Sequence, residues 1–228
     1  MKSKKYKYII FDADDTLVDY VLDSERAFQA ALVAAGCAGD EEVLRTWVEF
    51  DFGNWDKLGL SDLSTPAMQA RYHALYRTHV RDIFAQTPHL DGIAAEKAFL
   101  EEFAKPGIEI EGAAEVVAEL KARGYRVYAA TNGLASLQRT RLSAFPLDGI
   151  FISEEMDTVK PNPAYFEHIF AHLGAKKEEC LMVGDTLSTD IACARAVGVD
   201  CIWLNRRGKP CPNGVREIHN LKELLEIL

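Results

Sequence analysis

The sequence predicts an α/β protein with a doubly wound, mostly parallel sheet that carries an inserted all-helical region. Three observations lead to this prediction. Short apolar runs recur with helix-like segments between them, those runs are apolar without alternation, and one long stretch near the N-terminus contains no such run. Continuous apolar runs are typical of strands that are covered by helices on both faces of a parallel sheet.

Five apolar runs are the predicted strands. They are Tyr8 to Phe11, Val127 to Ala130, Ile150 to Ile152, Leu181 to Val183 and Cys201 to Leu204. Helical patterns lie between them: residues 112–124 have an apolar valine and leucine face and end at Gly124, and residues 189–199 close in the same way near Gly198. This βα alternation favours a parallel sheet.

The stretch from about Val18 to Lys105 has helix-like segments instead of strands. These segments are residues 24–35, 41–50, 68–84 and 94–103, with a polar connector around Ser61 to Pro66. The sequence therefore predicts a discontinuous core of residues 1–17 and 106–228, and a helical cap of residues 18–105 inserted after the first strand.

Composition limits the possible functions. A chain of 228 residues that is 48% hydrophobic can bury a full core. Its net charge of −9 argues against binding to a nucleic-acid polymer or a membrane surface, because such proteins favour basic patches. The five cysteines form no C-x-x-C pair, and no stretch has the length of a membrane span or a signal peptide, so a cytoplasmic protein is expected.

Polar motifs follow the predicted strands. They are Asp12-Ala13-Asp14-Asp15-Thr16, Thr131-Asn132-Gly133, Lys160-Pro161, and Gly184-Asp185 with Asp190. In open parallel sheets, ligands bind beyond the carboxyl ends of the strands. Each motif alone is also compatible with an ordinary turn or helix cap, and Asp190 in particular suits capping of a helix that begins near Thr189.

The four motifs in this order, D-x-D-x-T, T-N-G, K-P and G-D-x4-D, resemble those of the haloacid dehalogenase superfamily. The resemblance covers the whole core, and the helical stretch matches the cap that this family inserts after the first strand. It implies a Rossmann-like core and a Mg²⁺-dependent phosphatase that forms an aspartyl-phosphate on Asp12.

The residue types fit this chemistry. Phosphoryl transfer needs a nucleophile, a proton donor for the leaving oxygen and positive charge around the transferred group. Asp12 is the predicted nucleophile, and Asp14 the predicted general acid and then general base. Mg²⁺ prefers oxygen ligands, which the Asp12 and Asp185 carboxylates and the Asp14 backbone carbonyl supply, and by resemblance Asp190 supports the metal directly or through water.

Cationic and neutral groups are expected to hold the phosphate. Lys160 can bind Asp12 and a phosphate oxygen together, while the Thr131 hydroxyl and the Asn132 backbone N–H donate to the other oxygens. Gly133 permits a close approach of the backbone.

Two features have no assigned role in this chemistry. Asp15 stands where many members of the family have glycine, and its side chain is expected to point away from the phosphate. In the cap, Gly53 and Asn54 are expected to break a helix near the active site. The cap's aromatic residues are expected to pack together more than to contact substrate: Trp47, Phe50, Phe52, Trp55, Tyr72 and Tyr76.

Asp14 favours a phosphatase over a dehalogenase, because halide displacement leaves no alkoxide to protonate. A non-catalytic binder would need neither both aspartates nor the lysine, whereas a phosphomutase on the same core stays open. The phrases FDADDTL, TNGLASLQRTRL, ISEEMDTVKPNPAYFEHI and MVGDTLSTDI resemble the pyrimidine 5′-nucleotidases of the superfamily. The expected partner is a small phosphate ester, with a phosphoglycolate or sugar phosphate as alternatives, bound by a monomer or homodimer.

Overall fold

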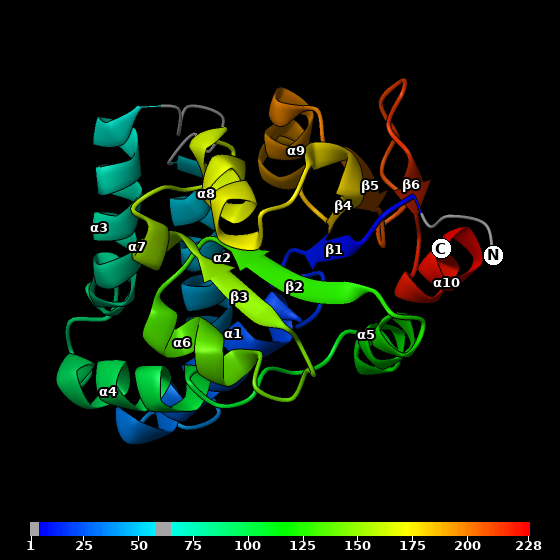
Figure 1. Ribbon diagram of the computed structural model, residues 1–228. Helices are drawn as coiled ribbons and strands as arrows, with labels where there is room; N and C mark the ends of the chain where they lie inside the picture. Colours follow the sequence, from blue (N-terminus) through cyan, green and yellow to red (C-terminus); the bar gives the residue numbers. More distant parts are fainter. Residues whose placement is uncertain (1–4, 58–64) are drawn as a thin grey trace.

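The computed structural model describes residues 5–57 and 65–228, and its strands form one sheet within that part of the chain (Figure 1). All neighbouring strands are parallel, in the order β3-β2-β1-β4-β5-β6. The strands are β1 (Tyr8–Phe11), β2 (Arg126–Thr131), β3 (Gly149–Ile152), β4 (Cys180–Gly184), β5 (Asp200–Leu204) and β6 (Glu217–Ile218). The predicted α/β fold is confirmed, and β6 is an additional strand too short to give a sequence pattern.

Helices cover both faces of this sheet, as Figure 1 shows, with α8 and α9 on one face and α5 and α10 on the other. From α5 onward the helices are α5 (Ala113–Ala122), α6 (Ala135–Arg141), α7 (Ser153–Met156), α8 (Ala164–Leu173), α9 (Ala192–Val197) and α10 (Leu224–Ile227). Short turns of 3₁₀-helix occupy η2 (Lys177–Glu179) and η4 (Leu221–Glu223), and a π-helical turn, η3 (Leu187–Ile191), precedes α9.

The central strand β1 explains why its sequence is apolar throughout. Tyr8 and Ile10 pack into the cluster under α8 and α9, whereas Ile9 and Phe11 pack into the cluster under α5 and α10. All four side chains are buried. A strand with both faces buried needs no polar alternation.

Between β1 and α5 the described chain forms four helices and, apart from isolated bridges at Val18, no strand: α1 (Tyr20–Ala34), α2 (Glu41–Lys57), α3 (Pro66–Phe84) and α4 (Gly92–Phe103). We call these four helices the helical region. Asp19, Thr65 and Asp91 cap α1, α3 and α4 through side-chain oxygens that accept backbone N–H groups. Part of the predicted polar connector, residues 61–64, lies outside the described residues.

The predicted helix break at Gly53 and Asn54 is wrong, because α2 continues through both residues. A glycine costs a helix interior only about 1 kcal/mol relative to alanine. Tertiary packing outweighs such a loss, and α2 is anchored by the fully buried side chains of Trp47 and Asp51.

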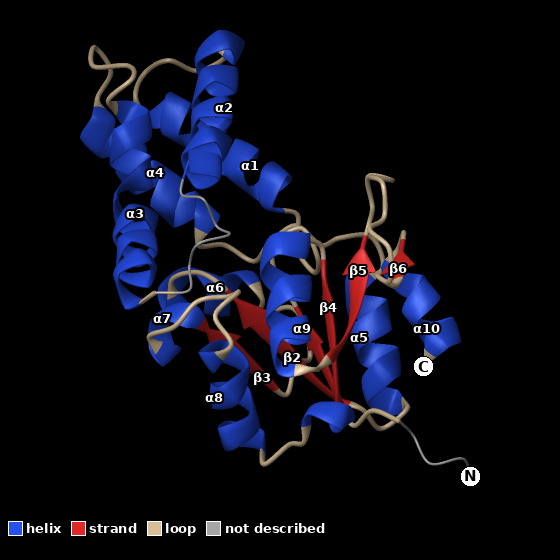
Figure 2. Cartoon of the chain, turned by 90° about the horizontal axis from the view of Figure 1, so that it is seen from above, coloured by secondary structure: helices blue, strands red, loops and turns tan. Residues whose placement is uncertain are grey.

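The helical region lies together at one side of the sheet (Figure 2). Its aromatic interior also includes Leu137 of α6 and Val159, which follow β2 and β3. The chain enters and leaves it along neighbouring backbone segments, since Asp19 N donates to Ile108 O at 2.8 Å. None of the described helices combines the length and apolarity required to cross a membrane.

Candidate active site

The site forms where the sheet changes its winding direction. The chain runs outward from β1 to β2 and β3, then returns to the other side of β1 to form β4. Asp12 and Asp185 therefore follow two adjacent strands, and Asp12 N donates to Val183 O at 2.8 Å. Such a switch point is where open α/β sheets bind ligands.

Lys160 lies at the centre of the site, at the carboxyl ends of the strands. Its Nζ lies 2.6 Å from Asp12 Oδ1 and 2.7 Å from both Asp190 Oδ1 and Ala130 O. Only 2% of the residue is exposed. Burial works against its charge, but the carboxylates of Asp12 and Asp190 outweigh burial and raise the pKa of Lys160 well above its ordinary value.

Three carboxylates meet beside the lysine. One oxygen from each of Asp12, Asp185 and Asp190 lies within 4.8 Å of the others. Burial first, and then the charge of Asp190, raise the pKa of Asp12 above its ordinary value and that of Asp185 to about 7. One ammonium among three carboxylates leaves an excess of negative charge, so the oxygen set fits a hard divalent cation.

Asp190 reaches this cluster from the π-helical turn η3. Its Oδ2 accepts the Thr186 N–H at 3.1 Å, while Oδ1 contacts Lys160. Gly184 is needed beneath it, because a Cβ at that position would collide with the Asp190 carboxyl group. Asp190 lies within η3, whose N-cap position is Thr186, and neither η3 nor α9 has a side-chain cap, so the structure does not support the capping interpretation of Asp190.

The T-N-G segment contacts the backbone of Lys160. The Asn132 side chain exchanges two 2.9 Å hydrogen bonds with the Lys160 backbone, so the loops after β2 and β3 hold each other. Thr131 is buried. Gly133 N donates to Ser153 Oγ at 3.0 Å, which makes Ser153, directly after β3, a residue that sequence reasoning missed.

Asp14 stands apart from the three clustered carboxylates. Its Oδ2 accepts Gln138 Nε2 at 2.8 Å, and its Oδ1 accepts Arg141 Nη1. Both donors lie on α6. Sequence reasoning missed them, although both stand in the segment TNGLASLQRTRL that follows the second strand.

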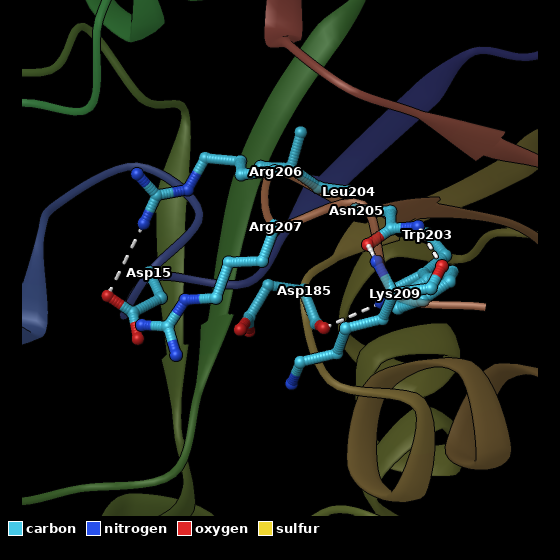
Figure 3. A pocket seen from close by; sticks show the side chains of 8 residues that line it. All are labelled: Asp15, Asp185, Trp203, Leu204, Asn205, Arg206, Arg207 and Lys209. Carbon is cyan, nitrogen blue, oxygen red and sulfur yellow. Dashed lines mark hydrogen bonds and ion pairs between the residues drawn. The ribbon is translucent and has the colours of Figure 1, made fainter. Parts of the chain in front are cut away.

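Asp15 adopts a left-handed backbone conformation, with φ of 57°. Aspartate tolerates this conformation better than most residues, and glycine adopts it freely. The Asp15 carboxylate accepts Tyr20 N at 3.2 Å and lies 3.6 Å from Arg206. Figure 3 shows Arg206, Arg207 and Lys209 around a pocket that Asp15 and Asp185 also line. Sequence reasoning did not identify these three cations, which the loop after β5 brings to the acidic edge.

Several of the predicted aromatic residues pack within the helical region. Trp47 and Tyr72 are buried in its interior, and Phe50 packs against it. The side chains of Phe52, Trp55 and Tyr76 lie outside the described residues.

This arrangement can bind a cation and an anion next to each other. An ionised carboxylate on a strand tip, held by an ammonium group, can attack an electrophilic centre that a cation and N–H donors hold in line. A second carboxyl group, Asp14, lies two residues from the first and can exchange a proton.

Comparisons with known proteins agree with this geometry. A family model described as haloacid dehalogenase-like hydrolase matches residues 6–198. The chain is 32% identical to the pyrimidine 5′-nucleotidase PynA of Streptococcus pneumoniae over 88% of this chain and 84% of the relative. It is 27% identical to the pyrimidine 5′-nucleotidase YjjG of Escherichia coli over 97% of this chain and 98% of the relative. Among solved structures, the magnesium-bound HAD-hydrolase YfnB of Bacillus subtilis matches with a TM-score of 0.78 and 26% identity over 99% of each chain.

Proposed function

The chain belongs to the haloacid dehalogenase-like hydrolase family and is a phosphoric monoester hydrolase, and on this premise we propose that it is a Mg²⁺-dependent pyrimidine 5′-nucleotidase. The observation that carries the proposed chemistry is the Lys160 ammonium, which bridges Asp12 and Asp190 beside Asp185. An acidic protein that binds phosphate needs such a charge arrangement.

In the proposed reaction, an Asp12 carboxylate oxygen attacks phosphorus and the ester P–O bond breaks. Asp14 gives its proton to the leaving oxygen, so the nucleoside departs as an alcohol. Water then attacks phosphorus and gives a proton to Asp14, and the P–O bond to Asp12 breaks. The balance is ester plus water to alcohol plus inorganic phosphate, with the enzyme restored.

The proposed metal ligands are the carboxylates of Asp12 and Asp185 and the backbone carbonyl of Asp14, with Asp190 in direct or water-mediated support. When bound, Mg²⁺ offsets the carboxylate charge and polarises a phosphate oxygen. Support comes from the three carboxylate oxygens that lie within 4.8 Å of one another.

The remaining phosphate oxygens are assigned to Lys160, the Thr131 hydroxyl and the Asn132 backbone N–H. Gly133 supports this loop through its hydrogen bond to Ser153. Residues 18–105 are proposed to form a cap domain that excludes water and selects the leaving group.

The substrate class rests on the relatives, because PynA and YjjG are both pyrimidine 5′-nucleotidases. The test measures phosphate release from UMP, dUMP, dTMP, AMP, phosphoglycolate and several sugar phosphates, in Mg²⁺ and in EDTA. Wild type is compared with Asp12→Asn and with Asp148→Asn, whose carboxylate accepts the Val127 N–H at the opposite end of the sheet.

We expect preference for the pyrimidine monophosphates, loss of turnover in EDTA and in Asp12→Asn, and full turnover in Asp148→Asn. Faster release from phosphoglycolate or a sugar phosphate would keep the mechanism and reject the nucleotidase. Return of the phosphate to a second position of a sugar would indicate a phosphomutase, and release that Asp12→Asn leaves intact would reject Asp12 as the nucleophile.

A further inference from the structure

A fully buried guanidinium joins the proposed proton donor to the helical region. Arg141 ends α6 and is 0% exposed. Its Nη1 donates to Asp14 Oδ1, and its Nη2 and Nε donate to Asp23 Oδ2 of α1 at 2.8 and 3.2 Å. The guanidinium carbon also lies 4.4 Å from the ring centroid of Phe103, at the end of α4. One side chain thus contacts the site and two helices of the helical region.

The contact with Asp23 is anchored on both sides. Asp23 is 0% exposed, and its Oδ1 accepts Ile108 N at 3.0 Å and lies 3.2 Å from Arg26 Nη2. A buried ion pair keeps its charges only when hydrogen bonds satisfy both partners. Arg141 therefore has little freedom to move while Asp23 stays in place.

The third nitrogen of the guanidinium reaches the site. Asp23 Oδ2 takes two of the guanidinium donors, whereas the buried Nη1 has Asp14 Oδ1 as its partner and lies 3.5 Å from Gln138 Oε1. The remaining Nη1 is turned to a carboxyl group that is 25% exposed at the site. Gln138, one helical turn earlier on the same face of α6, binds the other oxygen of that carboxyl group at 2.8 Å.

We propose that Arg141 is a positioning residue that, with Gln138, fixes the Asp14 carboxyl group, and that Asp23 of α1 fixes Arg141 in turn. The placement of the proton donor then depends on how the helical region is attached to α6. This inference rests on the proposed function for its kinetic consequence, whereas its structural content is independent of the substrate.

The kinetic consequence is selective for the leaving group. An alkoxide leaving group needs a proton in the transition state, whereas p-nitrophenolate is stable without one. Displacement of Asp14 should therefore lower kcat/KM, which reports on transfer of the phosphoryl group to Asp12, for UMP or glycerol 2-phosphate and spare it for p-nitrophenyl phosphate. Hydrolysis of the aspartyl-phosphate also uses Asp14, but that step is the same for every ester. A purely structural role for Arg141 would slow all three substrates by the same factor.

The experiment compares kcat/KM for these three esters, in Mg²⁺, for wild type, Arg141→Gln, Arg141→Lys and Asp23→Asn. The matched control is Arg139→Gln, since Arg139 lies on the same helix and pairs with Glu155 at the surface. Thermal unfolding establishes that each variant is folded. Arg141→Gln should lose about tenfold or more on the alkyl esters and less than about threefold on the aryl ester. Asp23→Asn should show the same selectivity with a smaller loss on the alkyl esters. Arg139→Gln should match wild type.

An unchanged ratio of alkyl to aryl kcat/KM in folded Arg141→Gln overturns the proposal. If that variant does not fold, Asp23→Asn and Gln138→Met are judged by the same ratio. Crystal structures of the folded variants, Arg141→Lys included, give a readout that needs no activity: an Asp14 carboxyl group that keeps its wild-type position in all of them also overturns the proposal. Absence of turnover in wild type itself counts against the proposed function, and the crystal structures then decide on the positioning alone.

Discussion

The charge cluster at the carboxyl ends of the strands and the aromatic cluster around Trp47 in the helical region are interiors of opposite kinds. In the charge cluster, Lys160 is buried between the carboxylates of Asp12 and Asp190, so its neighbours are held by charge. In the helical region, Trp47 is buried against aromatic rings such as Phe28, whose centroid lies 5.9 Å away. Charge balance depends on the identity of each residue, whereas apolar packing depends mainly on volume. The first interior can therefore define a reaction, and the second chiefly defines a shape.

The largest effect should come from isosteric removal of one carboxylate in each region. Asp12→Asn removes the proposed nucleophile, and turnover should fall by a factor on the order of 10³ or more. Asp51→Asn removes the buried α2 carboxylate that accepts the Tyr20 hydroxyl at 2.8 Å, and turnover of p-nitrophenyl phosphate should stay within about tenfold. Steady-state kinetics check both, and an equal loss in the two variants would remove the contrast between the regions.

The next effect concerns Lys160→Met. This change leaves Asp12 and Asp190 buried without their cation, so the free energy of unfolding in EDTA should fall by about 3–5 kcal/mol. Urea unfolding measures the loss, and Mg²⁺ should restore more stability to this variant than to wild type. Lys121→Met, which removes a lysine that pairs with Asp148 nearer the surface, should change stability by less than about 1 kcal/mol. Equal losses in the two lysine variants would contradict a charge-held interior.

In the helical region, Trp47→Ala should also cost about 3–5 kcal/mol of stability, because it leaves a large cavity. The Trp47 ring packs edge-on against the ring of Phe84, and the two ring centroids lie 4.8 Å apart. Trp47→Phe should recover most of that loss, as expected for an interior held by volume. Turnover of p-nitrophenyl phosphate by the folded Trp47→Ala protein should be close to that of wild type, and a loss as large as that of Asp12→Asn would make Trp47 part of the chemistry.

The smallest expected effect concerns Asp148, at the opposite end of the sheet. Burial alone would raise the pKa of Asp148, but the Val127 N–H and Lys121 outweigh it and hold the pKa below its ordinary value. Because the folded pKa lies below the unfolded one, the stabilisation is present above about pH 4 and is lost as the pH falls through the folded pKa. Asp148→Asn should cost about 1 kcal/mol at pH 7 and less at pH 3, measured by urea unfolding. A stability difference between wild type and Asp148→Asn that grows as the pH falls would contradict the predicted direction of the pKa shift.

The same contrast explains how far the sequence could be interpreted. The strands and the polar residues after them were predictable, because each strand is a continuous apolar run that ends at a polar motif. The sheet order places β1 beside β4, so Asp12 and Asp185 lie at neighbouring strand ends. The catalytic and binding roles of these residues stay predictions. Arg141 was not predictable, since its partner Asp14 is 127 positions away and nothing local distinguishes a buried arginine from a surface one on a short helix.

Two structural details could not be predicted from the sequence, for different reasons. The continuation of α2 through Gly53 depends on tertiary contacts that outweigh a local propensity. The pairing of β6 with β5 involves two residues, Glu217 and Ile218, and so leaves no periodic signal. Local rules are reliable where an element is long and buried, and weaker where a distant contact decides.

The chain enters and leaves the helical region along two neighbouring backbone segments, near Asp19 and Ile108, which we call its stems. Their proximity has a consequence for the order of folding. Strand β1 ends at Phe11 and its partner β2 begins at Arg126, so their pairing must close a long stretch of chain. Loop-closure entropy opposes such non-local pairing. The bond from Asp19 to Ile108 holds the two stems together once the helices have packed, which replaces the long stretch by a short effective loop. The helical region can therefore vary in length without making the first strand pairing slower to form.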